Sequence, residues 1–137
     1  MNRQRIVTAL ALLCGGSDTL TGLGLLIAPL PLLSAMGIHP LPAEPVFQRW
    51  IGAFVFGVGV SYLYPYFVAR HDLRARFARL RTVFEVTAMM RLFVALSVGG
   101  AIAAGELERA WGTVAAFDFA VALAQVAVLR NWRELDG

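Results

Sequence analysis

Four long apolar stretches, joined by short polar segments, set the pattern of this chain: residues 6–30, 46–69, 82–104 and 110–129. A helix needs about 20 apolar residues to cross the hydrocarbon core of a bilayer, and each stretch reaches about that length. The pattern therefore predicts an all-α membrane protein. We expect one domain over residues 1–137, an antiparallel bundle of four transmembrane helices.

A secretory signal peptide is the alternative interpretation of the first stretch. Ala9 and Ala11 have the small side chains of a cleavage site. The apolar segment that precedes them is much shorter than the apolar region of a signal peptide. We therefore expect residues 6–30 to remain in the protein as the first membrane helix.

The segments between the first three stretches carry distinct signals. Prolines crowd the first connection, where they predict the end of a helix and a stiff loop: Pro29, Pro31, Pro40, Pro42 and Pro45. Residues 31–36, closed by Gly37, predict one turn of helix in the membrane interface.

The next connection, residues 70–81, contains five arginines. Leu73, Phe77 and Leu80 share one helical face there, so this segment can lie on anionic headgroups; a plain stop-transfer loop is the alternative.

Small residues within the stretches predict where helices approach each other. Gly52, Gly57 and Gly59 give the second stretch a thin face, and Ala53 with Gly57 forms a small-xxx-small pattern. An alanine stripe in the fourth stretch predicts a further packing face: Ala116, Ala120 and Ala124. Pro65 has no N–H, so it should kink the second helix and free the carbonyl of Ser61.

The composition supports a membrane protein and gives its orientation. Of the 137 residues, 58% are hydrophobic and 15% are charged, against about 45–50% and about 25% in soluble domains. The net charge of +3 does not indicate nucleic acid, because the basic residues gather at the ends of the apolar stretches. By the positive-inside rule, both termini and residues 70–81 should lie in the cytoplasm. We expect a multi-pass protein of a bacterial inner membrane.

The sequence offers no signature of a metal or disulfide site. A single cysteine, Cys14, excludes an internal disulfide and argues against a metal cluster. The two histidines, His39 and His71, fall in loops that we place on opposite sides of the membrane, so they cannot share a metal ion. No cofactor is evident from motifs.

Ionisable residues lie inside three of the predicted helices at one depth. At 1.5 Å per residue from the cytoplasmic end, Asp18 lies about 18 Å deep, Asp118 about 17 Å and Arg91 about 14 Å. A charge at the bilayer centre costs at least about 2.5 kcal/mol. We therefore predict that the three side chains meet inside the bundle, out of contact with lipid. Gln125, on the face of Asp118, and Tyr62 complete the candidate polar cluster.

The charge count of this cluster leaves its chemistry open. One arginine cannot neutralise two carboxylates, so one aspartate stays protonated, the two share a proton, or another donor such as Tyr62 contributes. A carboxylic acid kept neutral in a dry site can donate a proton to a substrate. The structural alternative is a buried polar cluster that only fixes which helix faces meet.

Residues 22–29 read GLGLLIAP, Met36 and Gly37 follow them, and residues 49–57 read RWIGAFVFG ahead of Tyr62. Together these residues resemble the DoxX-like group of small bacterial four-helix membrane proteins. In that group the first helix ends in a proline and the second opens with an arginine and glycines. The resemblance implies an inner-membrane bundle and, in some members, a link to quinone-coupled redox complexes. It supplies no catalytic motif to transfer.

These observations predict a small module that binds a lipophilic molecule, such as a quinone or a lipid, or that joins a larger membrane complex, without catalysis. One alternative is a membrane enzyme doing acid–base chemistry, either isomerisation or a redox-linked step, on a lipophilic substrate. The other is a proton or solute path in a homo-oligomer. A pocket of about 300 Å³ or more that reaches the aspartates from the lipid would favour a ligand.

Overall fold

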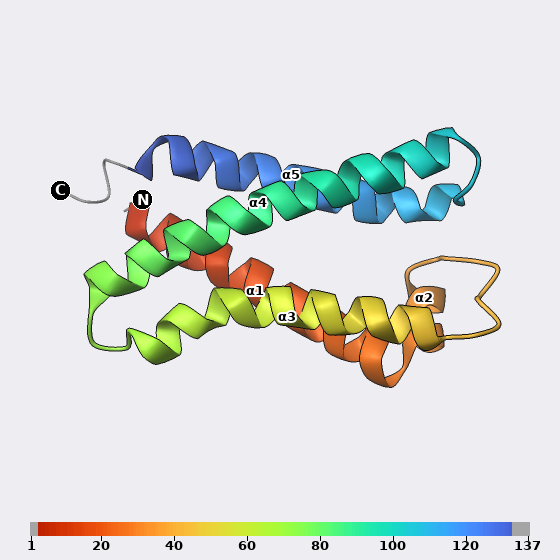
Figure 1. Ribbon diagram of the computed structural model, residues 1–137, viewed down its shortest axis with the longest axis horizontal. Helices are drawn as coiled ribbons and strands as arrows, with labels where there is room; N and C mark the ends of the chain where they lie inside the picture. Colours follow the sequence, from red (N-terminus) through yellow and green to blue (C-terminus); the bar gives the residue numbers. More distant parts are fainter. Residues whose placement is uncertain (1–2, 133–137) are drawn as a thin grey trace.

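The computed structural model describes residues 3–132, and that part of the chain is helical with short connections (Figure 1). In chain order the elements are α1 (Arg3–Ile27), α2 (Pro29–Ala35), α3 (Val46–Val68), α4 (Leu73–Ala103), the 3-10 helix η1 (Arg109–Trp111) and α5 (Gly112–Arg130). Four helices are long and apolar enough to cross a bilayer: α1, α3, α4 and, with η1, α5. The predicted all-helical class is therefore confirmed, and residues 3–132 contain four helices with the length and apolar composition that a membrane span needs.

The third long helix begins earlier than residue 82, where the sequence placed its start. Helix α4 runs without a break over 31 residues, Leu73–Ala103, and includes most of the basic segment. The carboxylate of Asp72 caps it by accepting a hydrogen bond from the backbone N–H of Ala75 at 3.0 Å. The predicted boundary was wrong because the change in hydropathy marks where charged residues end, and nothing there interrupts a helix.

The first helix ends before residue 30, the last residue of the first apolar stretch. Helix α1 stops at Ile27, and α2 is a separate helix that begins at Pro29. Gly37 follows α2 with a φ of 75°, and the N–H of Ile38 reaches back to the carbonyl of Leu33 at 3.0 Å. Leu33 and Ile38 are both buried, which is the hydrophobic contact expected of this glycine-terminated helix end. The predicted helical turn closed by Gly37 therefore exists, as a slightly longer helix.

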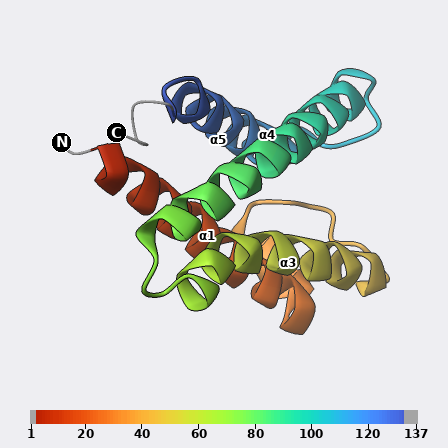
Figure 2. The ribbon, with the colours of Figure 1, turned by 60° about the vertical axis from the view of Figure 1, so that its left-hand side comes forward.

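The long helices form two pairs, the N-terminal pair α1 and α3 and the C-terminal pair α4 and α5 (Figure 1 and Figure 2). The first turn of α1, the last turn of α5 and the loop between α3 and α4 lie at the same end of the molecule (Figure 1). Contacts between the two pairs are made chiefly by α3 and α4. The site described below lies where the pairs meet.

Glycines bring the two helices of the N-terminal pair into backbone contact. A Cβ atom at Gly22 would collide with the backbone of Phe56, and one at Gly59 would collide with the backbone of Thr19. The same is true at Gly52, where a Cβ would lie 2.9 Å from the carbonyl oxygen of Gly22. These positions accept only glycine without movement of a backbone.

The other small residues that the sequence predicted to pack helices together are mostly exposed. Ala53 and Gly57 are exposed, and a Cβ at Gly57 would meet no atom within 4 Å. In the predicted alanine stripe, Ala116 and Ala120 are exposed as well. Both predictions of close helix packing are therefore wrong within the described chain, because spacing alone does not say which small face meets a neighbour.

A hydrophobic core joins the two pairs near the end that holds the α3–α4 loop. It contains buried residues from all parts of the bundle: Val7, Ala11, Cys14, Tyr62, Leu80, Phe84 and Trp132. Trp132 is 2% exposed. Its ring packs edge-on against Phe84, with the ring centres 6.1 Å apart.

Candidate functional site

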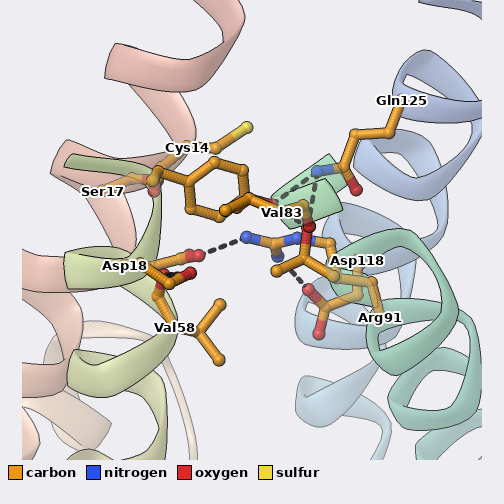
Figure 3. A network of polar contacts seen from close by, with 11 residues as sticks. Cys14, Ser17, Asp18, Val58, Val83, Arg91, Asp118 and Gln125 are labelled. Carbon is orange, nitrogen blue, oxygen red and sulfur yellow. Dashed lines mark hydrogen bonds and ion pairs between the residues drawn. The ribbon is translucent and has the colours of Figure 1, made fainter. Parts of the chain in front are cut away.

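Arg91 of α4 lies between two aspartates that belong to different helix pairs (Figure 3). Its Nη2 atom donates to Asp18 Oδ2 on α1, and its Nη1 atom donates to Asp118 Oδ1 on α5. The exposed fractions of the side chains of Arg91, Asp18 and Asp118 are 7%, 9% and 13%. The guanidinium therefore links the N-terminal pair to the C-terminal pair through buried ion pairs.

Small neighbours make room for these charges. On α4, Ala88 and Ala95 lie on the same face as Arg91 and are buried with it. Asp18 is buried on α1, whose neighbouring Gly15 lies against Tyr62. The ring of Phe117 lies beside the guanidinium, 5.7 Å from ring centre to Cζ, which adds a cation–π contact. Alanine and glycine therefore allow a long charged side chain to reach across the bundle.

Neutral side chains from three helices form the second half of the cluster. The hydroxyl of Tyr62 donates to Thr87 Oγ1 at 2.7 Å, and the hydroxyl of Thr87 donates to the carbonyl of Val83 at 2.6 Å. Gln125 Nε2 donates to Tyr62 Oη and, at 3.0 Å, to Thr87 Oγ1. Tyr62 and Gln125 have no exposed area, so this hydrogen-bond network is dry. Each of the four long helices contributes to the polar cluster. The cluster consists of Asp18, Tyr62, Thr87, Arg91, Asp118 and Gln125.

Two buried polar atoms of the cluster have no partner in the described part of the chain. Arg91 Nε and Gln125 Oε1 form no hydrogen bond within residues 3–132. Because one guanidinium pairs with two carboxyl groups, the three ionisable side chains sum to one negative charge when both aspartates are ionised. The cluster can therefore hold one further proton or accept one further hydrogen bond without rearrangement of its ion pairs.

The five residues predicted for the site lie together: Asp18, Tyr62, Arg91, Asp118 and Gln125. The residue missed as a member is Thr87, which receives hydrogen bonds from both Tyr62 and Gln125. Thr87 precedes Arg91 by four residues and therefore lies on the same face of α4. That spacing was a usable signal, because a polar residue one turn from a buried charge often shares its environment.

An open groove of about 450 Å³ runs between α3 and α4 beside the cluster. Its lining is mostly apolar: Ala53, Phe54, Gly57, Val58, Ser61, Thr82, Val83, Val86, Thr87 and Met90. Thr87 belongs both to this lining and to the cluster, and Val58 and Val83 lie next to the cluster in Figure 3. The groove thus reaches the neutral half of the cluster, and neither aspartate belongs to its lining.

Comparisons with protein-family models, with curated proteins and with solved structures find no match for this chain. The resemblance to DoxX-like proteins therefore stays a prediction. In residues 3–132, no group of three or more His, Cys, Asp or Glu side chains is placed to hold a metal ion. The function is argued below from the groove and the polar cluster.

Proposed function

We propose that this chain is a membrane module that binds a lipophilic molecule in the groove between α3 and α4, without catalysis. The observation that carries the proposal is the groove itself, an open, mostly apolar groove of about 450 Å³ whose lining includes Thr87 of the polar cluster. Binding sites for small molecules commonly enclose about 300–1,000 Å³ and combine apolar walls with a few polar groups. A phospholipid or a quinone has the matching combination of apolar chain and polar end.

The floor of the groove leaves room for a ligand. Ala53, Gly57 and Ser61 follow one another at intervals of four residues along α3, so they form a strip of small side chains. A Cβ at Gly57 would meet no atom within 4 Å, so the space above the strip is free. A flexible chain of methylene groups fits such a strip.

The polar cluster gives the groove a fixed width in this proposal. The pairs meet chiefly through α3 and α4, the two walls of the groove. Arg91 on α4 reaches past α3 to Asp18 on α1, and Tyr62 on α3 donates to Thr87 on α4. Buried ion pairs and hydrogen bonds of this kind have strict geometry, so they hold the walls at one separation.

The proposal includes the membrane orientation that the charges favour. We place the chain in a bacterial inner membrane as an antiparallel bundle, with both termini and the α3–α4 loop in the cytoplasm. Five arginines lie between residues 70 and 81, and the connection between α4 and α5 instead contains Glu106 and Glu108. This asymmetry supports the orientation by the positive-inside rule.

Filling the groove tests the proposal. Gly57→Leu places a side chain into the free space, and Gly100→Leu is a matched control, because a Cβ at Gly100 also meets no atom within 4 Å and the residue lies outside the groove. Mass spectrometry of the purified proteins should detect a lipophile with the wild type and with Gly100→Leu but not with Gly57→Leu. Equal lipophile content in all three proteins would contradict the proposal.

The charge count favours a second candidate function, an enzyme that uses an aspartic acid as a proton donor to a lipophile. One arginine faces two aspartates in a buried site, as a proton-donating carboxyl group requires. This candidate ranks second because the aspartates do not line the groove. It predicts that the co-purified lipophile is converted by the wild type and left unchanged by Asp118→Asn. Conversion by both proteins, or by neither, would count against it.

A further inference from the structure

The α4 wall of the groove continues beyond the groove to Arg79, an arginine that has no partner among residues 3–132. We propose that the groove binds one acyl chain of an anionic phospholipid and that Arg79 binds its phosphate. This inference rests on the proposed function, whose ligand it names by chemical class.

Arg79 lies on the face of α4 that lines the groove. An α-helix turns by about 100° per residue, so residues 3, 4, 7 and 11 positions after Arg79 lie within about 60° of it. These residues are Thr82, Val83, Val86 and Met90, and all four line the groove. Arg79 therefore extends the apolar wall by one turn toward the α3–α4 loop, with its positive charge at the end.

Two of the neighbouring arginines, Arg76 and Arg81, are already engaged. Arg76 donates to the carbonyl oxygens of Ala69 and Arg70 and lies 5.2 Å from the ring centre of Tyr66, so it covers the end of α3. Arg81 pairs with Glu85 at 3.0 Å on the opposite side of α4. Across residues 3–132, the exposed side chain of Arg79 forms no hydrogen bond or ion pair. Its guanidinium is therefore available to a ligand from outside the chain.

The length of the wall suits one leaflet of a bilayer. From Arg79 to Met90 the helix rises about 16 Å, which is close to half of the roughly 30 Å hydrocarbon core. A phospholipid whose phosphate lies at Arg79 therefore has its acyl chain beside Val83, Val86 and Met90. Thr82, one turn from Arg79, donates to the carbonyl of Ala78 only at 3.5 Å, so its hydroxyl can donate to the phosphate instead.

The charge of Arg79 selects an anionic headgroup over a zwitterionic one. A guanidinium donates two parallel hydrogen bonds to phosphate oxygens, and a zwitterionic headgroup brings its own cation to the same place. One arginine at the membrane surface favours an anionic lipid about fivefold. The preference should depend on Arg79 and on the open groove together.

Native mass spectrometry of the full chain, released from nanodiscs of equal amounts of dioleoylphosphatidylglycerol and dioleoylphosphatidylcholine, tests the inference. We expect one retained lipid, with phosphatidylglycerol favoured about fivefold. Arg79→Gln should make the two lipids nearly equal. Arg74→Gln removes the same charge from an exposed arginine about 140° around α4 and should leave the preference unchanged. Gly57→Leu should remove both lipids.

The outcomes separate this inference from the proposed function. Equal retention of both lipids by the wild type, with loss of both in Gly57→Leu, would overturn the anionic-lipid inference and leave the lipophile site in place. An equal loss of preference in Arg74→Gln and Arg79→Gln would also overturn the inference, because it indicates a diffuse basic surface. Retention of both lipids by Gly57→Leu at the wild-type level would contradict the proposed function itself.

Discussion

The two contact surfaces of α3 are built from opposite kinds of residue. Toward α1, glycines let the backbones touch: a Cβ at Gly22 or Gly59 would collide with the backbone of the other helix. Toward α4, the contact is made by long side chains, with Tyr62 donating to Thr87 and with Arg91 reaching Asp18 on α1. The first surface has no space for a ligand, and the second leaves a groove of about 450 Å³.

In our proposal, this difference lets a small bundle be rigid and still hold a ligand. Backbone contact through glycine gives close packing, which is what stabilises helix pairs in a bilayer. Side chains that span a wider gap hold two pairs at a distance and leave apolar walls accessible between them. The predictions that follow separate the contributions of the two surfaces to stability.

Removing the guanidinium should have the largest effect. Arg91→Leu leaves two buried carboxyl groups, on Asp18 and Asp118, without their cation, and we expect a loss of about 4 kcal/mol in the free energy of unfolding. Thermal unfolding in detergent measures the effect. Arg49→Leu, at an exposed arginine of α3, is the control and should stay near the wild type. A wild-type melting curve for Arg91→Leu would show that the ion pairs do not join the helix pairs.

A single methyl group on the glycine surface should have the next largest effect. Gly22→Ala forces the backbones of α1 and α3 apart and should cost about 3 kcal/mol. Gly16→Ala is the control on the same helix, since a Cβ at Gly16 meets no atom within 4 Å. The same unfolding measurement compares them, and equal stability of the two variants would contradict the close contact.

Loss of one hydroxyl from the wider surface should have a smaller effect. Tyr62→Phe keeps the ring in the core and removes the donor to Thr87, at a cost of about 1 kcal/mol. Tyr64→Phe is the control, because Tyr64 is exposed on the same helix. Hydrogen exchange in α3 and α4 should rise only in Tyr62→Phe. No difference between the two variants would remove Tyr62 from the network.

The smallest loss of stability is expected from breaking an exposed ion pair. Arg81 and Glu85 pair at 3.0 Å, and both side chains are 49% exposed. Glu85→Gln should change the unfolding free energy by less than about 0.5 kcal/mol, because water screens an exposed pair. A loss comparable to that of Arg91→Leu would show that burial does not explain the difference between the two ion pairs.

The length of the apolar stretches predicted the long helices, and the cost of a buried charge predicted most of the polar cluster. A charge deep in an apolar stretch is too costly to face lipid, so equal depth on Asp18, Arg91 and Asp118 predicted that they meet. Depth and helical face also placed Tyr62 and Gln125. Thr87 was missed as a member because a threonine costs little in a membrane helix and therefore gives no such signal.

The packing of small residues and the groove could not be predicted in the same way. The sequence predicts a helix contact equally at Gly57 and at Gly59, yet Gly59 touches α1 and Gly57 faces open space. Which of the two packs depends on the rotation of α3 about its own axis, and that rotation is set by its partners. The free face of Arg79 likewise depends on α4 continuing to Leu73, beyond the boundary that hydropathy predicted.

A double-mutant cycle between Asp18 and Arg91 is the most direct test of the link between the two helix pairs. Asp18→Asn, Arg91→Gln and the double variant would be unfolded in bicelles, and the coupling free energy would be obtained from the four stabilities. For side chains in direct contact across the two pairs we expect a coupling of about 2 kcal/mol. Additive effects, with a coupling below about 0.5 kcal/mol, would show that the two side chains do not interact.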